Sequence, residues 1–578
     1  MTGESILILA LRRLRTPLLI LITVYAIGIM GLVLIPGVDA EGRPAHLSYF
    51  HAFYFLTYTA STIGFGEIPY AFTDTQRLWV SVVIFLAVIG WAYTLAAFLA
   101  LARDRSFRLA VTTTVFGRRV RALGEPFYVV CGYGETGALV CEGLDRVGIR
   151  FVVLDIDPAR IDELDLHTYH GDVAALVADA KLPENLLRAG ITHPSCRGAI
   201  ALTNDDEANL AVAITMKLVS PRIPVLCRAT RRGIVANMAS FDTDHIINPF
   251  QAFGAHLWSA LHAPAMHRLT LRVTSLPGTG MPERTPPPRG HWIVCGYGRF
   301  GREVVGSFLR EGLSVTIIDP EPPADERHRF VRGLGTEART LMEAGLAQAV
   351  GVVAGTDDDV NNLSIAMTAR AEKPGLFVVA RQNLQANRIL FDKFGADVTM
   401  VSARIIALES LARIRAPLLA PFLSLSAAQT EGWAAALEGE FQRILGDVVP
   451  MVWQVSIDHA NAPALVDLSG GARGAWPLDV LLRDPSSRHE RLACVALLCA
   501  RGHAEVSLLP AAGSDLAPGD AILFAGTPAA RSRQELTLRN TNVLKYVETG
   551  IEAPGGYVWQ WLDLSRARRA GLERSSDS

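Results

Sequence analysis

The sequence predicts three kinds of structure in one chain: an α-helical membrane part with two spans and a re-entrant loop, two doubly wound α/β domains, and a β-rich C-terminal subdomain. Two uncharged apolar segments, 16–36 and 78–102, predict the membrane part. A glycine-rich motif that occurs twice predicts the α/β domains, and short apolar strands after residue 446 predict the last subdomain. At 578 residues the chain is too long for a single domain.

The two apolar segments are long enough to cross a bilayer. They contain 21 and 25 residues, and about 20 apolar residues suffice for a helix that spans a hydrocarbon core. Basic residues flank both segments: Arg12, Arg13 and Arg15 before the first, and Arg103, Arg105 and Arg108 after the second. Because Lys and Arg accumulate in cytoplasmic loops, we expect a multi-pass protein of the cell membrane with both termini cytoplasmic, residues 1–15 forming the N-terminal part.

The five residues between the spans that carry the most specific signal are Thr62, Ile63, Gly64, Phe65 and Gly66. They resemble the T-V-G-Y-G selectivity filter of potassium channels, in which rings of backbone carbonyls replace the hydration shell of K⁺. Glycine allows the backbone conformations that aim successive carbonyls along one axis. Ile63 and Phe65 are expected to pack behind the filter, and the aromatic stretch 49–60 is expected to be the pore helix. The segment 16–103 is therefore predicted to be a pore, with K⁺ as the permeant ion.

Gly90 lies midway along the second apolar segment. A glycine at this place allows the helix to bend, which predicts a gating hinge. A small residue also allows two membrane helices to pack closely, and both interpretations stay open.

A duplication follows the membrane part. The motif GYGETG at 132–137 recurs as GYGRFG at 296–301, and Asp155 recurs as Asp319, each 164 residues later. Each motif follows an apolar strand, precedes a helical pattern and meets its acidic residue 23 positions after its first glycine. This is the dinucleotide-binding fingerprint in its required context, so two Rossmann-like domains are predicted. The acidic residue can accept hydrogen bonds from ribose hydroxyls, which favours NAD or an adenine nucleotide over a 2′-phosphate.

The repeat continues through two further strand predictions in each copy. Thr203 and Thr356 end the fourth strands, Arg228 and Arg381 end the fifth strands, and both pairs are 153 residues apart. Strands that alternate with helices indicate parallel sheets. The acidic runs 205–207 and 357–359 follow the fourth strands; they could bind Ca²⁺ or simply charge a helix N-terminus.

Together with the filter, these repeats resemble the RCK family, the regulators of K⁺ conductance related to TrkA nucleotide-binding subunits. The resemblance implies nucleotide-binding residues in both copies. In copy one they are Gly132, Tyr133, Gly134, Glu135, Thr136, Gly137, Asp155, Asp172 of a Gly-Asp pair, Thr203 and Arg228. In copy two they are Gly296, Gly298, Arg299, Phe300, Gly301, Asp319, Thr356 and Arg381.

The resemblance also implies an assembly and a mode of gating. We expect a homotetramer in the lipid bilayer, with a cytoplasmic ring of eight RCK domains whose ligand controls the pore. The two copies are not expected to be equivalent. The 164-residue offset places Thr336 where copy one has Asp172, and copy two carries Arg299 inside its glycine loop.

The remaining segments complete the predicted organisation. We expect a linker at 104–125, the first RCK domain at 126–284, a proline-rich joint at 285–290 and the second RCK lobe at 291–445. A TrkA-C-like subdomain at 446–535 and a tail at 536–578 follow, and the helical stretches 250–262 and 403–415 are expected to be dimerisation helices, as in the family.

Composition excludes other classes. The formal net charge of −2 gives no indication of nucleic-acid binding, and the seven cysteines show no metal-ligand spacing. We expect no enzymatic activity, because no catalytic acid, base or nucleophile accompanies the sheets. Two alternatives to a ligand-gated channel stay open: a membrane-tethered NAD-dependent oxidoreductase, and a non-conducting nucleotide-sensing membrane subunit.

Overall fold

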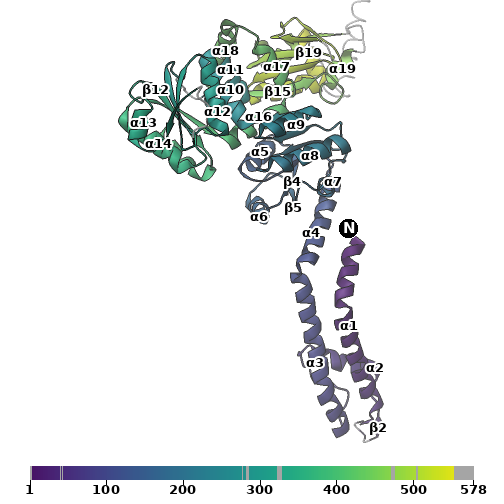
Figure 1. Ribbon diagram of the computed structural model, residues 1–578. Helices are drawn as coiled ribbons and strands as arrows, with labels where there is room; N and C mark the ends of the chain where they lie inside the picture. Colours follow the sequence, from purple (N-terminus) through teal and green to yellow (C-terminus); the bar gives the residue numbers. More distant parts are fainter. Residues whose placement is uncertain are drawn as a thin grey trace, which may run out of the picture. The chain divides into compact units, whose positions relative to one another are not determined.

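The computed structural model describes residues 3–39, 41, 43–275, 277–281, 286–321, 328–469, 475–502 and 505–551. It divides into two compact units, one containing the membrane part and the other containing most of the α/β and C-terminal parts. Figure 1 shows the elements of both.

The membrane part consists of long helices joined by short connections. Its elements are α1 (Gly3–Leu34), β1 (Gly37–Val38), β2 (Pro44–Ala45), α2 (Tyr49–Ala60), α3 (Asp74–Arg103) and α4 (Arg105–Arg121). Residues 12–34 of α1 and the whole of α3 are long and apolar enough to span a membrane. The expected pore helix 49–60 is α2, and the expected linker 104–125 contains helix α4. Within the described residues, the expected N-terminal segment belongs to α1.

Close backbone approach holds α1 against α3. A Cβ on Gly31 would collide with the indole of Trp79, and one on Gly28 would come within 2.7 Å of Val83. Trp79 Nε1 donates a hydrogen bond of 3.3 Å to the Gly28 carbonyl. Small residues thus let an aromatic side chain lie directly on the neighbouring helix.

Copy one is a six-stranded sheet in the order β5-β4-β3-β6-β7-β8. Its strands are β3 (Phe127–Cys131), β4 (Arg150–Asp155), β5 (Ala174–Val177), β6 (Cys196–Ala201), β7 (Val225–Arg228) and β8 (His245–Ile247). Its helices are α5 (Glu135–Arg146), α6 (Pro158–Leu166), α7 (Pro183–Arg188), α8 (Asp206–Val219), α9 (Arg232–Ser240), α10 (Pro249–His262) and α11 (Pro264–Thr274). The strand pairs β3–β4, β3–β6, β6–β7 and β7–β8 are parallel.

Copy two repeats this order as β11-β10-β9-β12-β13-β14, all parallel. Its strands are β9 (His291–Cys295), β10 (Ser314–Asp319), β11 (Arg329–Arg332), β12 (Ala349–Ala354), β13 (Phe377–Gln382) and β14 (Val398–Val401). Its helices are α12 (Arg299–Arg310), α13 (Ala338–Glu343), α14 (Asp359–Glu372), η1 (Gln385–Asn387), α15 (Arg388–Phe394) and α16 (Ser402–Arg415). The predicted pair of doubly wound parallel sheets is confirmed.

The two copies exchange helices. Helix α10 of copy one packs on α12 of copy two, and α16 of copy two packs on α5 of copy one. Phe250, Phe253 and Leu257 of α10 are buried in one core cluster with Phe300 and Phe308 of α12. The helices expected at 250–262 and 403–415 therefore join the two copies of a single chain.

The C-terminal subdomain is built on an antiparallel sheet in the order β15-β22-β19-β20. Its strands are β15 (Met451–Ser456), β16 (Trp476–Pro477), β17 (Arg483–Asp484), β18 (Ser487–Arg491), β19 (Cys494–Arg501), β20 (Glu505–Leu508), β21 (Asp515–Leu516) and β22 (Ala521–Gly526). The helices after α16 are α17 (Leu419–Ser426), α18 (Glu431–Leu445), α19 (Pro463–Ser469), α20 (Asp479–Leu482), α21 (Pro528–Arg539) and α22 (Thr541–Thr549).

Two expected boundaries change. Position 535 falls inside α21, and Leu544 and Val547 of α22 are buried in the core of the subdomain. The fold therefore extends at least to residue 549, because the amphipathic α22 contributes to that core. The proline-rich joint begins at Thr285, which lies outside the described residues. Pro288 belongs to copy two, since its carbonyl accepts a 3.1 Å hydrogen bond from Trp292 Nε1.

Candidate functional site

The predicted filter follows the carboxyl end of α2. The backbone N–H groups of Ile63 and Gly64 donate to the Tyr58 carbonyl at 3.0 and 3.2 Å. Thr62, Gly64 and Gly66 have φ of 63°, 62° and 73°, whereas the intervening Ile63 and Phe65 do not have positive φ. Left-handed conformations at every second residue turn successive carbonyls toward one side of the chain. This is the geometry that a row of carbonyl ligands needs.

The side chains of the filter are largely exposed on the single chain. Ile63 is 61% exposed and Phe65 is 63% exposed. Phe65 contacts Tyr58 edge-on, with ring centroids 6.1 Å apart. Of the two residues expected to pack behind the filter, Phe65 thus has an aromatic neighbour on the pore helix.

Two pore-helix tyrosines hold the residue after the filter. Tyr54 Oη donates to Glu67 Oε2 at 2.9 Å, and Tyr58 Oη donates to the Glu67 carbonyl at 3.2 Å. Phe65 carries no hydroxyl that could form a hydrogen bond behind the filter. The hydroxyls of Tyr54 and Tyr58 anchor the end of the filter instead. Sequence reasoning missed them, although their spacing of four places them on one face of a helix.

Helix α3 continues without a break through Gly90. A Cβ at this position would lie 3.6 Å from Leu21, an ordinary van der Waals contact. Thr94 Oγ1 donates to the Gly90 carbonyl at 2.8 Å. The gating hinge therefore stays a prediction.

The glycine loop of copy one lies at the carboxyl edge of its sheet. Gly132 has φ of 99°, and a Cβ on Gly137 would collide with the Gly132 carbonyl. Helix α5 begins after Gly134 without a side-chain cap, and nothing lies within 4 Å of a Cβ built on Gly134. No side chain thus caps the first turn of α5, and the backbone at Gly134 leaves room for a ligand, as a phosphate site requires. Glu135 and Thr136 form the first turn of this helix.

Asp155 lies beside this loop. Its Oδ2 accepts from the Tyr133 N–H at 2.6 Å, and its Oδ1 accepts from the Asp157 N–H at 2.8 Å. Among the described residues each carboxylate oxygen accepts one of these hydrogen bonds, and an ionised carboxylate can accept about four. Asp155 thus occupies the predicted position for a ribose ligand.

Thr203 and Arg228 meet at the same edge. Arg228 Nη1 donates to the Thr203 carbonyl at 3.0 Å and to Asn204 Oδ1 at 2.5 Å. Burial lowers the pKa of Arg228, and the positive charge of Arg299 lowers it further. The guanidinium stays charged, since arginine cannot be deprotonated in proteins, and its Nε is buried without a hydrogen-bond partner among the described residues.

A buried asparagine ties these strand ends together in each copy. Asn209 Oδ1 accepts from the Thr203 N–H and hydroxyl at 3.0 and 2.8 Å, and its Nδ2 donates to the Thr203 and Arg228 carbonyls, both at 2.9 Å. Asn362 makes the same four bonds to Thr356 and Arg381. Neither asparagine was predicted from the sequence, although the two are 153 residues apart, as the two threonines are.

Asp172 does not lie where the resemblance implied. It precedes β5, and its neighbour Gly171 lies against the guanidinium of Arg150, the first residue of β4. The start of a strand is at the opposite edge of a parallel sheet from the glycine loop. Asp179 instead follows β5 at the carboxyl edge, where its neighbour Lys181 pairs with Asp205. The prediction was wrong because the Gly171-Asp172 pair precedes β5, whereas the position implied by the resemblance follows a strand.

Copy two has the same loop geometry and a different polar edge. Gly296 has φ of 92°, a Cβ on Gly301 would collide with the Gly296 carbonyl, and α12 begins after Gly298 without a side-chain cap. Asp319 accepts from the Tyr297 N–H at 2.7 Å. Arg381, however, forms an ion pair of 2.5 Å with Asp357. Asp179 is the second residue after β5, and Leu334 is the second residue after β11. The counterpart of Asp179 in copy two is therefore Leu334 and not Thr336.

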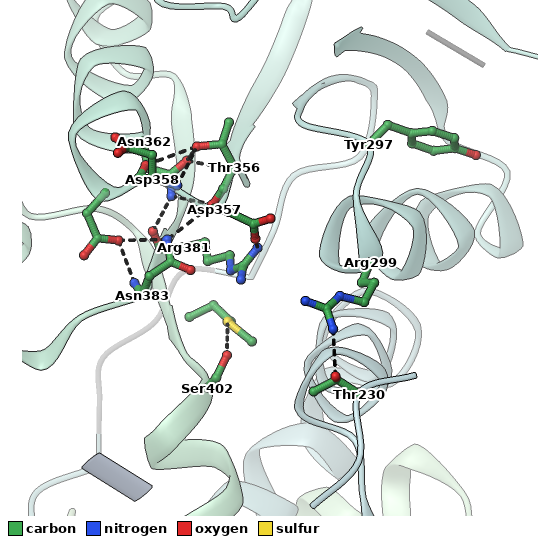
Figure 2. A network of polar contacts seen from close by, with 12 residues as sticks. Thr230, Tyr297, Arg299, Thr356, Asp357, Asp358, Asn362, Arg381, Asn383 and Ser402 are labelled. Atoms are coloured by element: carbon green, nitrogen blue, oxygen red, sulfur yellow. Dashed lines mark hydrogen bonds and ion pairs between the residues drawn. The ribbon is translucent and has the colours of Figure 1, made fainter. Parts of the chain in front are cut away.

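Residues of each glycine loop reach the other copy. Figure 2 shows Arg299 of copy two directed to Thr230 of copy one, whose hydroxyl accepts from Arg299 Nη1 at 2.7 Å. Glu135 of copy one accepts from the Gln385 N–H of copy two at 2.8 Å. From the sequence, Arg299 was expected to lie inside the glycine loop of its own copy. Its side chain instead extends to copy one. Phe300 is fully buried against Phe250 and Phe253 instead of facing a ligand.

The acidic runs considered for Ca²⁺ have other partners. Asp205 and Asp358 cap α8 and α14, and Asp206 accepts from the N–H groups of Thr230 and Arg231. Asp359 accepts from the N–H groups of Asn383 and Leu384. Among the described residues no cluster of three or more metal-binding side chains is present. The geometry gives a Ca²⁺ site no support.

Comparison with known families agrees with this architecture. The family described as ion channel matches residues 18–104, and the TrkA-N domain matches residues 128–249 and 292–402. The protein joins an ion-channel domain to two TrkA-N domains. The predicted resemblance and fold class are thereby confirmed, and the chain is a membrane protein.

Several relatives share parts of this organisation. Potassium channel protein 1 of Methanocaldococcus jannaschii is 25% identical over 210 residues, which cover 36% of this chain and 61% of that protein. An uncharacterized protein of Methanothermus fervidus is 28% identical over 252 residues, or 43% of this chain and 38% of its own length. The Trk system potassium uptake protein TrkA of Mycobacterium tuberculosis is 32% identical over 120 residues, 20% of this chain and 54% of that protein. These matches span less than two thirds of each relative.

Among solved structures, the GsuK channel covers 92% of this chain and 99% of its own, with 17% identity and a TM-score of 0.47. Another structure of GsuK, described as bound to NAD, covers 93% of this chain and 99% of its own, with 17% identity and a TM-score of 0.45.

Proposed function

We propose that this protein is a K⁺-selective channel of four chains, opened or closed by an adenine nucleotide or NAD-like ligand on its TrkA-N domains. The observation that carries the proposal is the alternating handedness of residues 62–66 at the end of the pore helix. One chain supplies one row of carbonyls, and coordination of K⁺ needs a ring of them. The exposure of Ile63 and Phe65 on the single chain is consistent with neighbours on several sides.

Four chains would bring eight TrkA-N domains together. The flanking arginines support cytoplasmic termini, and hence a cytoplasmic ring, by the positive-inside rule. A ligand gates only if it binds the open and closed rings with different affinity. Helix α4 connects the ring to α3 along the chain, so it is the element through which a change in the ring would reach the pore.

The carboxyl edge of copy one is the better candidate for the nucleotide. Its open α5 N-terminus suits a phosphate, and Asp155 suits a ribose. Two positive charges lie at this edge. Arg228 is the last residue of β7, and Arg299 of copy two bonds to Thr230. An acid at position 155 disfavours a ligand with a 2′-phosphate by charge repulsion.

Ion flux from proteoliposomes tests conduction. The purified full chain should pass K⁺ and Rb⁺ well and Na⁺ poorly, and Gly66→Ala should abolish flux because alanine disfavours φ of 73°. Gly124→Ala is a control, since that glycine has free space and no positive φ. Equal K⁺ and Na⁺ permeability would contradict a selective filter. No flux at all from folded protein would favour the non-conducting sensor.

A membrane-tethered oxidoreductase is the alternative from a different class. The relatives with assigned names are potassium channel and potassium transport proteins, which supports a non-enzymatic role. Among the residues that the structure describes, the carboxyl edges contain arginines, threonines and asparagines that bond to backbone and to one another, which does not favour proton transfer to a second substrate. Transfer of hydride from NADH to an added acceptor would contradict the proposal.

A further inference from the structure

Six arginines gather where the two apolar spans end. They are Arg12, Arg13 and Arg15 of α1, Arg103 at the end of α3, and Arg105 and Arg108 at the start of α4, and all six are exposed. We call this set the arginine cluster. Within the described part of the chain, Asp104 is its one ionic partner, through a 2.8 Å contact with Arg13 Nη1.

The ion pair between Arg13 and Asp104 holds the two halves of the cluster together. Asp104 lies at the break between α3 and α4, with φ of −64° and ψ of 124°. Its Oδ1 caps α4 by accepting from the Phe107 N–H at 3.1 Å, while its Oδ2 receives Arg13. The Phe107 N–H and the Arg13 charge lower the pKa of Asp104, so the carboxylate stays ionised at neutral pH.

The cluster has a large excess of positive charge. Six arginines and one carboxylate leave five positive charges within a few turns of two adjacent helices. Membrane orientation requires positive charge on this side of the membrane. It does not require that one carboxylate, Asp104, link the arginines of α1 to those of α3 and α4. Like charges brought together by Asp104 repel one another, and a phosphate-bearing anion would relieve that repulsion.

The position of the cluster selects the anion. Uncharged apolar helix lies on one side of it in both α1 and α3, so the guanidinium groups lie at the level of the lipid headgroups. Guanidinium binds phosphate with two parallel hydrogen bonds. We propose that the arginine cluster binds the headgroup of an anionic phospholipid. The proposal depends on the proposed membrane orientation only for the choice of leaflet, and not on conduction.

Helix α4 supplies its own control. Arg118 and Arg121 are exposed on the last turn of α4. Arg118 is 13 residues beyond Arg105, about 20 Å along the helix axis. That distance exceeds the Debye length of about 8 Å at physiological salt, so these arginines do not contribute to binding at the membrane surface.

The test is lipid retention by the full chain. The protein is reconstituted in phosphatidylcholine with one quarter phosphatidylglycerol, extracted in mild detergent, and its bound lipids are identified by native mass spectrometry. Wild type should retain phosphatidylglycerol in preference to phosphatidylcholine. The triple variant Arg103→Gln, Arg105→Gln, Arg108→Gln should bind it roughly 100-fold more weakly, at about 5-fold per arginine. The double variant Arg118→Gln, Arg121→Gln should behave as wild type.

Equal retention by the triple variant, or equal loss by the double variant, would overturn the proposal. If the triple variant does not insert into membranes, the wild type alone decides. Raising KCl from 0.1 M to 1 M shortens the Debye length from about 10 Å to about 3 Å and should release most of the phosphatidylglycerol. Retention that does not change with salt, or that is the same for both lipids, would refute recognition by charge.

Discussion

The two TrkA-N domains share a fold and differ in the charge at their ligand edges. Copy one has Arg228 next to the neutral Asn204 and receives Arg299 from copy two. Copy two has Arg381 paired with Asp357 and receives Glu135 from copy one. The same exchange of loop residues therefore adds a positive charge to one edge and a negative charge to the other, although burial lowers the pKa of Arg381 and Arg299 lies close enough to lower it further. Two duplicated domains can thus keep the same packing and differ in their affinity for an anion. The difference arises from one residue in each glycine loop, Glu135 in copy one and Arg299 in copy two.

The largest expected effect comes from a matched pair of substitutions in the two glycine loops. Gly134→Asp should weaken ADP binding to the full chain by about 100-fold, near 3 kcal/mol, because a carboxylate then faces the phosphates. Gly298→Asp should leave affinity within about 3-fold. At both positions a Cβ would meet no atom within 4 Å, so we expect both variants to fold. Titration calorimetry measures the difference, and an equal loss in both variants would show that the copies are equivalent.

A second comparison separates the two origins of positive charge at copy one. Arg299→Gln should weaken ADP binding about 10-fold or more, since a hydrogen bond to a charged group contributes about 1.5–3 kcal/mol. Arg302→Gln is the control, because Arg302 lies on the same helix and bonds only to the Tyr297 carbonyl among the described residues. If Arg299 served a site in copy two instead, Arg299→Gln would no longer weaken ADP binding in a chain that already carries Gly298→Asp.

A third comparison should show no difference between the copies. Asn209→Ala and Asn362→Ala each remove four hydrogen bonds from a buried position, and each should destabilise the folded protein by about 1–3 kcal/mol. Thermal unfolding of the full chain in detergent provides the measurement. A large effect in only one copy would indicate that the asparagine has a ligand role there.

The smallest expected effect is a pH dependence specific to copy one. Burial lowers the pKa of His245, and the charge of Arg413 lowers it further, although Asp244 and Glu409 oppose this. The folded state therefore disfavours protonation: stability is unaffected above the unfolded pKa of about 6.5 and falls as the pH decreases below it. His245→Gln should flatten the melting temperature between pH 7.5 and 5.5. Val398, its counterpart 153 residues later, cannot titrate.

The regular parts of the chain could be predicted from sequence. The pore helix at 49–60 was predicted with both ends correct. Four strands of each sheet, β3, β4, β6 and β7 in copy one and β9, β10, β12 and β13 in copy two, were predicted within about two residues, because apolar runs between turn residues define them, whereas β5 and β11 were not predicted. The positions of Asp155, Asp319 and both glycine loops also follow from a fingerprint whose spacing the backbone geometry fixes.

Two features could not be predicted, for different reasons. The offset between the copies changes from 164 at the second strand to 155 at the third, where β5 ends at Val177 and β11 ends at Arg332. Loops between these strands vary in length at little cost, so a fixed offset misplaced the counterpart of Asp172. The direction of Arg299 depends on which copy lies opposite its helix, and periodicity within one copy contains no information about that.

The exchange of α10 and α16 has a consequence for cleavage of the backbone. Each TrkA-N domain packs its first helix, α5 or α12, against a helix that belongs to the other domain, so a break between residues 277 and 290 would leave two fragments with complementary apolar surfaces. Such a nicked chain should stay together under native conditions and separate only in denaturant. Two fragments that are expressed from separate mRNAs should associate in the same way. The joint is therefore suitable for attaching split reporters, whose signal depends on association of the fragments.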